Sequence, residues 1–268
     1  VPLQGLIQAQ FQEASYLDQV MTVPEQRHLL ERSGLGAPLA LLQKLQGKTR
    51  WEGVQMIIND LRTVSWNSPP RWVRRESPAY WARGDMEEPE RQRFNMARDR
   101  EMGEFRLWWI REMLETPSPQ TERLVLFWHN HFVSAYPALD EHSTALARQN
   151  LMFRKQGSGN FRTLLKAVIR DAAMLNYLDN NNNKRNAPNE NLARELLELF
   201  TLGEGNYDED TVKEAARALA GYRTNELRDL SFEISPWDQD RGLKNILGSW
   251  GFHDGDDLID LILEQPRA

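Results

Sequence analysis

The chain has 268 residues, 40% of them hydrophobic and nine of them tryptophan, which allows a substantial core without covalent cross-links. It has no cysteine, which excludes disulfides, iron–sulfur clusters and thiolate zinc sites. Its 33 basic and 39 acidic residues are interspersed and argue against nucleic acid as a partner, and no apolar run reaches the roughly 18 to 20 residues that a transmembrane helix requires.

The first part of the chain predicts helices separated by short breaks. Residues 26–61 place leucine, isoleucine and valine at helical spacing, interrupted at 34–38 and at Gly47. Residues 63–89 contain four prolines together with Trp66, Trp72 and Trp81, so we expect an ordered loop, since flexible linkers seldom carry that much tryptophan. Exposed rings in this loop would instead suit carbohydrate binding. Residues 89–115 then predict one long helix with an apolar stripe.

The later part of the chain continues this pattern. We expect helices that begin near Ser118 or Thr121, at a cap formed by Asp140 with Ser143, at Phe161, and over residues 208–222 and 256–264. Residues 222–252 lack helical periodicity, and residues 231–234 predict a strand. The sequence thus predicts a mainly α fold, a multi-helix orthogonal bundle with a small β-hairpin insertion near residues 222–252, in one helical domain of residues 1–268. Because the helix over 256–264 has no obvious packing partner, we expect a chain truncated at its C-terminus.

Two histidines lie in the motif WHNHF over residues 128–132. On a helix, residues two apart diverge by about 200°, so His129 and His131 are poorly placed to share one metal ion. Three interpretations stay open: both rings make structural hydrogen bonds, one ring is functional, or at least one binds a metal.

Pro188 and Asn189 predict the start of a helix and Gly203 or Gly205 its end, and the rows of this helix separate apolar from polar side chains. Leu192, Leu196 and Leu199 form one apolar row. Asn191, Glu195 and Glu198 share one row, and Glu190 with Arg194 forms an i,i+4 pair beside it. Two carboxylates one turn apart among leucines need a neutralising partner. Arg194, Arg170, Arg185 or an imidazole would supply it structurally; the alternatives are a divalent metal held by His131, Glu195 and Glu198, or a carboxylate pair that acts in acid–base catalysis.

Eight asparagines lie from Asn176 to Asn191. Asparagine tolerates left-handed backbone and hydrogen-bonds its own chain, so the stretch predicts an ordinary polar turn. Its amides and carbonyls would also suit calcium or a polar sugar. The candidate substrate-binding residues are Asp179, Asn180, Asn189, Asn191 and Arg194.

Several longer motifs, in this order, carry a resemblance to a known family. They are RSGLG (32–36), LFWHNHFV (126–133), GNFRTLL (159–165), RDAAMLNYLDN (170–180), PNENLARELLELFTLG (188–203), EAARALAG (214–221) and GDDLID (255–260). On these motifs the chain resembles, over residues 28–268, the bacterial family called domain of unknown function 1800.

The resemblance implies a mainly helical bacterial protein, often exported and often encoded beside a sulfatase-like partner, without an established activity. Family members usually extend further at the C-terminus. They also tend to show a His-Asp pair before a glycine and lysine, where this chain has WDQDRGLK over residues 237–244. That difference weakens any mechanism that needs a histidine in this loop.

Two functions follow as expectations. The first is an exported, periplasmic or envelope-associated component of a larger assembly, with a protein partner, in which the His/Glu/Asn cluster is structural or binds a ligand; a cytoplasmic location also stays open. The alternative is a metal-dependent or acid–base hydrolase-like enzyme, with His129 or His131 and Glu195 or Glu198 as catalytic groups in one cleft.

Overall fold

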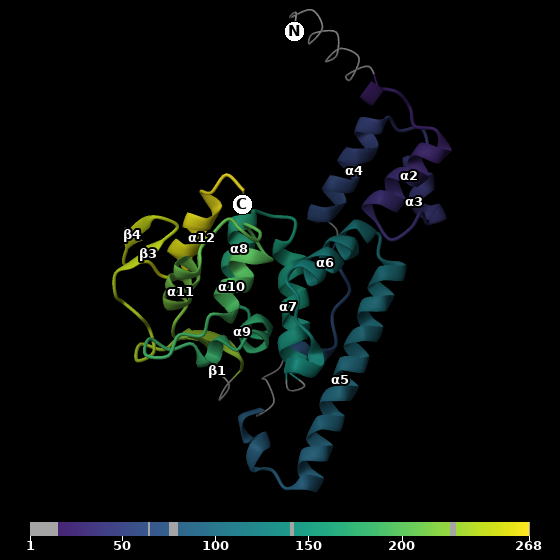
Figure 1. The fold of residues 1–268 in the computed structure, drawn as a ribbon. Helices are drawn as coiled ribbons and strands as arrows, with labels where there is room; N and C mark the ends of the chain where they lie inside the picture. The colour runs from purple at the N-terminus through teal and green to yellow at the C-terminus, as the bar shows by residue number, and fades with distance from the viewer. Residues whose placement is uncertain (1–15, 64, 75–79, 140–141, 226–228, 268) are drawn as a thin grey trace, which may run out of the picture. The chain divides into compact units, whose positions relative to one another are not determined.

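The computed structural model describes residues 16–63, 65–74, 80–139, 142–225 and 229–267. Within these ranges the fold is mainly α, as predicted, with eleven α-helices and two small two-stranded antiparallel sheets (Figure 1). The chain divides into two compact units: the residues up to Ser68 with Leu107–Leu126, and Pro69–Arg106 with Phe127 onward. That residues 1–268 form a single domain stays a prediction.

The first unit is built around three helices, α2 (Val23–Ser33), α3 (Leu39–Leu45) and α4 (Arg50–Thr63). The predicted breaks are confirmed, because α2 ends before Gly34 and Gly47 adopts a left-handed φ of 76° between α3 and α4. Met21, Leu30, Leu41 and Leu45 form the buried core between these helices.

The proline- and tryptophan-rich segment after α4 contains two short 3-10 helices, η1 (Arg71–Arg74) and η2 (Tyr80–Asp85). Trp72 is buried, and its indole N–H donates to Glu104 at 3.1 Å, which holds η1 against the next helix. Its ring is therefore not an exposed platform for a sugar. Trp66 is half-buried, and the Trp81 side chain falls outside the described residues.

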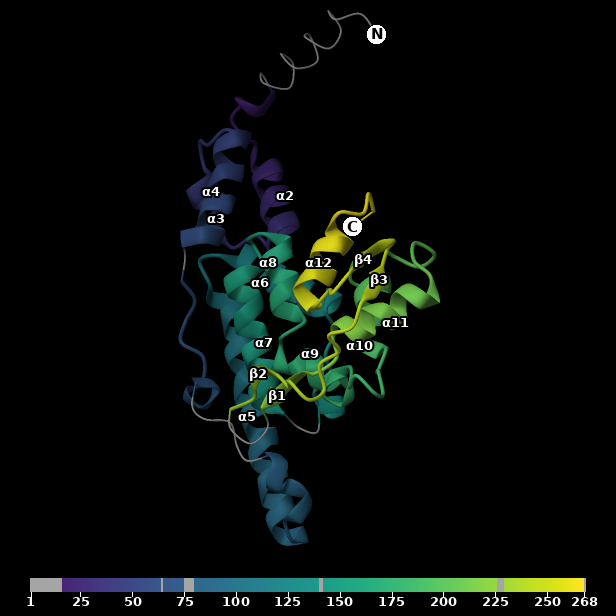
Figure 2. The ribbon, with the colours of Figure 1, turned by 90° about the vertical axis from the view of Figure 1, so that its left-hand side faces the viewer.

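The remaining helices are α5 (Glu88–Glu115), α6 (Pro119–His131), η3 (Tyr136–Leu139), α7 (Ser143–Gln156), α8 (Phe161–Val168), α9 (Ala172–Tyr177), η4 (Asn180–Asn182), α10 (Asn191–Glu198), α11 (Glu209–Ala218) and α12 (Gly255–Leu263). They belong to the second unit, except that α5 from Leu107 onward and α6 as far as Leu126 belong to the first. Ser143 begins α7 but does not cap it, since its hydroxyl donates to Glu101 at 2.8 Å; Asp140 falls outside the described residues. Helices α10 and α11 lie side by side, as do α8 and α12 (Figure 2).

The predicted hairpin is confirmed and is accompanied by a second one. Strand β1 (Tyr222–Asn225) pairs with β2 (Ser231–Ile234), and β3 (Lys244–Ile246) pairs with β4 (Ser249–Gly251). The last helix does have a packing partner, contrary to expectation: Ile259 of α12 is fully buried, and Asp260 pairs with Lys166 of α8 at 2.9 Å.

The asparagine-rich segment links α9 to α10 and is held by its own amides. Asn180 donates its amide to the carbonyl oxygens of Leu219 at 3.3 Å and Tyr222 at 2.7 Å, while Asn183 donates to that of Ala216 at 2.9 Å. These carbonyls lie at and just beyond the C-terminus of α11, where a helix leaves its last carbonyls without intrahelical partners. The two buried asparagines therefore fasten this segment to α11 and fix where α10 begins.

No helix within the described ranges has both the length and the apolar character that crossing a bilayer requires.

Candidate pocket around Glu195

The end of α6 is anchored in an aromatic cluster of the second unit. The indole N–H of Trp128 donates to the carbonyl oxygen of Gly157 at 2.9 Å, and a Cβ at Gly157 would lie within 2.5 Å of the ring. Phe132 is fully buried and stacks against Trp128 at a centroid distance of 5.5 Å. The two histidines between these rings leave the helix in different directions, as residues two apart on a helix do.

His129 is enclosed by α7. Its Nε2 atom lies 3.0 Å from the amide nitrogen of Asn150, whose amide oxygen in turn accepts from Nε of Arg154 at 2.9 Å. Because that amide nitrogen can only donate, Nε2 accepts and the ring is neutral with its proton on Nδ1. Burial, with a smaller contribution from Arg154, lowers the pKa of His129 to about 4.

His131 is the histidine that reaches the pocket. Its Nε2 atom lies 3.0 Å from the carbonyl oxygen of Phe200, and its ring stacks on Phe127 at 6.0 Å. A carbonyl only accepts, so Nε2 carries the proton and, in the neutral ring, Nδ1 is an acceptor. The two imidazoles of one motif therefore hold opposite tautomers.

Helix α10 follows the predicted rows but ends earlier than the motif suggests. Leu192, Ala193, Leu196 and Leu197 are fully buried. The helix ends at Glu198, and the backbone N–H groups of both Leu199 and Phe200 donate to the Glu195 carbonyl at 2.9 Å. This turn leaves Leu199, predicted to lie in the apolar row, 62% exposed.

The two carboxylates of α10 have different environments. Glu198 accepts a hydrogen bond from the hydroxyl of Tyr207 at 2.7 Å, and burial together with this carboxylate raises the pKa of Tyr207 to about 12. The carboxylate of Glu195 accepts no hydrogen bond and forms no ion pair within the described residues. Partial burial and then the charge of Glu198 raise the pKa of Glu195, and Arg194 opposes them only in part.

Of the three arginines that could neutralise Glu195, two are engaged elsewhere, and Arg185 forms no ion pair within the described residues. Arg194 pairs with Glu190 at 3.0 Å, the predicted i,i+4 contact, and with Glu209 at 2.7 Å. Arg170 pairs with Asp256 of α12 at 2.7 Å. The expectation that one of the nearby cations would form an ion pair with Glu195 is therefore wrong.

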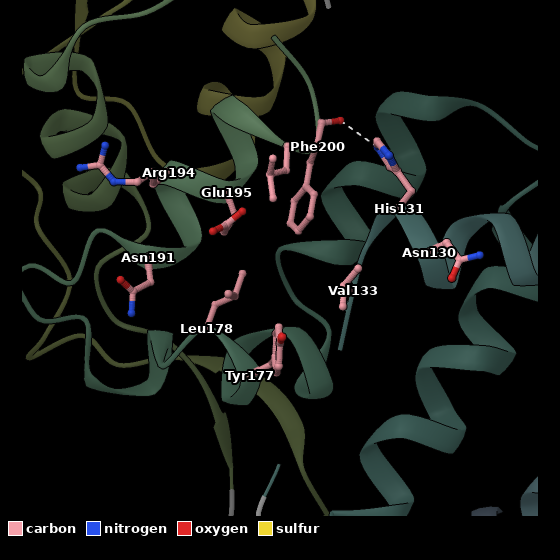
Figure 3. Close-up of a pocket in the computed structure, with 10 residues that line it drawn as sticks. Asn130, His131, Val133, Tyr177, Leu178, Asn191, Arg194, Glu195 and Phe200 are labelled. Carbon is pink, nitrogen blue, oxygen red and sulfur yellow. Dashed lines mark hydrogen bonds between the residues drawn. The ribbon is translucent and has the colours of Figure 1, made fainter. Parts of the chain in front are cut away.

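An open pocket of about 760 Å³ surrounds the carboxylate of Glu195. Figure 3 shows this carboxylate directed into the space between α10, the end of α9 and Phe200. The residues that line the pocket are Asn130, His131, Val133, Tyr177, Leu178, Asn191, Arg194, Glu195, Leu199 and Phe200. The lining thus combines polar side chains with aliphatic and aromatic ones.

The structure brings together four of the predicted site residues, namely His131, Asn191, Arg194 and Glu195. His129 and Glu198 are absent from the lining and have the partners given above. Asn189 donates its amide to the Asp179 carboxylate at 3.1 Å and accepts from the N–H of Asn191 at 3.0 Å. Asn189 and Asp179 therefore make contacts within the loop and do not line the pocket. Asn180 is buried against α11.

Metal binding finds no support in this arrangement. Among the residues that the structure describes, no group of three or more histidine, aspartate or glutamate side chains is placed to hold a metal ion.

Sequence reasoning missed the walls of the pocket. Tyr177, Leu178, Val133 and Phe200 follow the apolar pattern of core residues, and no sequence signal separates a pocket wall from the core. Tyr207 was equally hidden, because its contact with Glu198 depends on the turn that follows α10.

These features define a mainly α-helical protein with a partly apolar pocket around a carboxylate that has no partner among the described residues. The chain belongs to the family described as protein of unknown function (DUF1800), whose model matches residues 28–268. Comparison with curated proteins and with solved structures finds no match.

Proposed function

We propose that the protein binds a small ligand that brings a positively charged, hydrogen-bond-donating group, such as an ammonium, to Glu195. The observation that carries the proposal is the Glu195 carboxylate itself, which faces an open pocket and has no partner among the described residues. A partly desolvated carboxylate without a donor is unfavourable, and a ligand that supplies the donor removes this penalty.

The charge around the pocket favours a cation over an anion. Arg194 is the one cationic side chain among the described lining residues, and it already contacts two carboxylates, Glu190 and Glu209. Glu195 and Glu198 remain without an ion-pair partner in the described residues. A positively charged ligand would be attracted to both carboxylates and would offset their mutual repulsion. An anion would instead be repelled by both.

The apolar side of the pocket defines the rest of the ligand. Tyr177, Phe200 and Leu178 offer aromatic and aliphatic contact. An ammonium group gains from an aromatic face within about 6 Å. A compact organic amine with an apolar part therefore fits the lining better than a sugar or an inorganic cation.

The test compares benzylammonium with its neutral analogue, benzyl alcohol, at constant ionic strength. A ligand that binds the folded state raises the midpoint of thermal unfolding. We expect benzylammonium, but not benzyl alcohol, to raise the midpoint of the unaltered protein. Glu195→Gln should abolish the rise, and Glu264→Gln, a matched change at an exposed carboxylate away from the pocket, should preserve it. An undiminished rise in Glu195→Gln would disprove the proposal.

Acid–base catalysis on the bound ligand is a second candidate function. It is favoured by the raised pKa of Glu195 and by the presence of His131 in the same pocket. A carboxyl group whose pKa is raised above its ordinary value is better suited to proton transfer near neutral pH, and such transfer contributes about 10²- to 10⁴-fold to a rate. The hydrolase-like hypothesis then narrows to Glu195 and His131, without His129 or Glu198.

A chromogenic amide of a cationic amino acid, lysine p-nitroanilide, tests this second candidate. We expect slow hydrolysis that falls at least 100-fold in Glu195→Gln and is unchanged in Glu264→Gln. Hydrolysis that survives in Glu195→Gln, or none in the unaltered protein, would count against catalysis of this kind and would leave ligand binding to be judged by the thermal experiment.

Export to the periplasm or envelope and membership of a larger assembly are also proposals, and the family resemblance is their support. Cell fractionation, followed by mass spectrometry of proteins that copurify with the chain from its native cells, tests both. Recovery of the chain alone from the cytoplasmic fraction would overturn them.

A further inference from the structure

A second pocket, of about 390 Å³, lies in the same unit between the asparagine-rich segment and the loop that follows β2. Its lining is almost entirely polar, and none of its residues belongs to the Glu195 pocket. The lining residues are Arg185, Asn186, Pro236, Gln239, Asp240, Arg241 and Gly242.

Contacts of both backbone and side chains hold the two loops of this pocket in place. The N–H of Arg185 donates to the carbonyl oxygen of Asp238 at 2.8 Å, and the hydroxyl of Ser235 donates to the Asp238 carboxylate at 2.7 Å. Gly221 sits beneath the loop with a left-handed φ of 81°, and a Cβ there would lie 2.8 Å from the backbone nitrogen of Gln239. These contacts fix the positions of both loops.

The one carboxylate in the lining is already neutralised. Asp240 accepts from Nε of Arg217 at 2.8 Å and from the N–H of Gly242 at 2.7 Å, and the buried ammonium of Lys244 lies 3.7 Å from it. Burial opposes ionisation of Asp240, but the hydrogen bonds from Arg217 and Gly242 outweigh it and lower its pKa. Asp240 therefore remains charged and has its own cations.

Two guanidinium groups in the lining lack such a partner. Arg185 makes no side-chain hydrogen bond or ion pair within the described residues. Arg241 uses only Nε, which donates to the amide oxygen of Gln239 at 3.0 Å, so its two terminal nitrogens stay available. Because the charge of Asp240 is taken by Arg217 and Lys244, the lining keeps an excess of positive charge.

We propose that this pocket binds an oxyanion, either a carboxylate or a tetrahedral phosphate or sulfate group, between Arg185 and Arg241. The planar donor fork of a guanidinium matches two oxygens of such a group. Asn186 also lines the pocket, and its side-chain amide is a neutral donor. This site is independent of the Glu195 pocket, and its ligand has the opposite charge.

Isothermal titration with sodium phosphate, sulfate and acetate, each against a chloride background of the same ionic strength, tests the proposal. We expect saturable binding of at least one probe. Preference for phosphate and sulfate would identify a tetrahedral group as the ligand, and preference for acetate would identify a carboxylate. Absence of saturable binding for all three overturns the site.

Matched variants assign the binding to these residues. Arg185→Gln and Arg241→Gln should each weaken binding at least tenfold, whereas Arg267→Gln, the same charge change in the same unit, should alter it less than twofold. Arg185→Lys should recover only part of the affinity, because lysine keeps the charge but loses the fork. Equal weakening in all three glutamine variants would show general charge attraction and overturn the proposal. Arg185 and Arg241 are both exposed, so we expect the variants to fold, and their unfolding midpoints in buffer check this.

Discussion

The Nε2 atom of His131 lies 3.0 Å from the carbonyl oxygen of Phe200, and this contact joins the end of α6 to the turn that follows α10. The same turn exposes Leu199 and ends the helix that carries Glu195. The bond therefore sets the tautomer of an imidazole and also holds one wall of the pocket. His129, two residues earlier, accepts a hydrogen bond through its Nε2 and faces α7.

The opposite tautomers of these histidines can be observed directly. In ¹⁵N spectra of the protein with labelled histidine near pH 7.5, His131 should carry its proton on Nε2 and His129 on Nδ1, since their partners are a carbonyl and an amide nitrogen. Spectra of His131→Gln and His129→Gln assign the signals. The same tautomer at both rings would contradict the geometry.

The buried, neutral state of His129 predicts a pH dependence of stability. Its pKa is about 4 in the folded protein, below its ordinary value of 6.5, so the unfolded chain binds more protons between these values. The stabilising contribution is complete above about pH 6.5 and is lost as the pH falls toward 4. As the pH falls from about 6.5 to 4, the unaltered protein should therefore lose about 1 to 3 kcal/mol of unfolding free energy relative to His129→Gln.

Urea unfolding at several pH values measures this difference. Glutamine keeps an acceptor for Asn150, so the variant removes the titration while retaining a hydrogen bond. His28→Gln, the same substitution at an exposed histidine, is the matched control. A difference for His129→Gln that does not change with pH would show that the His129 ring titrates equally in both states.

The helices of this fold could be predicted because their signals are local. The boundaries of α5 and the rows of α10 follow from spacing along a single helix, and the Glu190 and Arg194 pair lies within one turn. The partners of the other charges could not be predicted in the same way. Arg170 pairs with Asp256, which is 86 residues away in the sequence. Only the folded chain shows that this arginine is paired there and does not neutralise Glu195.

The asparagine-rich segment illustrates the same limit. Its composition predicts a turn, but the need of α11 for donors at its C-terminus is a tertiary fact that the segment alone does not reveal. Likewise, Tyr177 and Leu178 follow the pattern of core residues, but the folded chain places them in the wall of a pocket.

The fastening role of Asn180 predicts a large loss of stability on its removal. Asn180→Ala removes the donor at 2.7 Å from the carbonyl oxygen of Tyr222, whereas that of Leu219 keeps the backbone N–H of Tyr222 at 3.1 Å. A buried polar group left unsatisfied costs about 1 to 3 kcal/mol, so we expect the free energy of unfolding to fall by at least about 1 kcal/mol. Asn186→Ala, in the exposed part of the same segment, should change it by less than about 0.5 kcal/mol. Similar values for the two variants in urea unfolding would refute the fastening role.

Asp171 predicts a pH dependence opposite to that of His129. Its carboxylate caps α9 by accepting the N–H of Met174 at 3.0 Å and accepts from the amide of Gln149 at 2.7 Å, yet burial outweighs these bonds and raises its pKa to about 7. The folded protein therefore binds more protons than the unfolded chain between the ordinary value of 3.8 and about 7. The contribution of Asp171 is complete at low pH and declines as the pH rises through this range.

Asp171→Asn should remove this decline, because asparagine keeps the capping oxygen and cannot ionise. The side-chain oxygen of Gln149 is buried without a hydrogen-bond partner in the described residues. If the Gln149 amide rotates, this oxygen can accept from the amide of the introduced asparagine. Relative to the unaltered protein, the variant should gain at least about 1 kcal/mol of unfolding free energy between pH 4 and pH 7.5. Since Asp171 and His129 act in opposite directions, the unaltered protein shows only their sum, and the two variants measured across the same pH series separate them. A variant that loses stability relative to the unaltered protein as the pH rises would show that the carboxylate is stabilised in the fold as an ion.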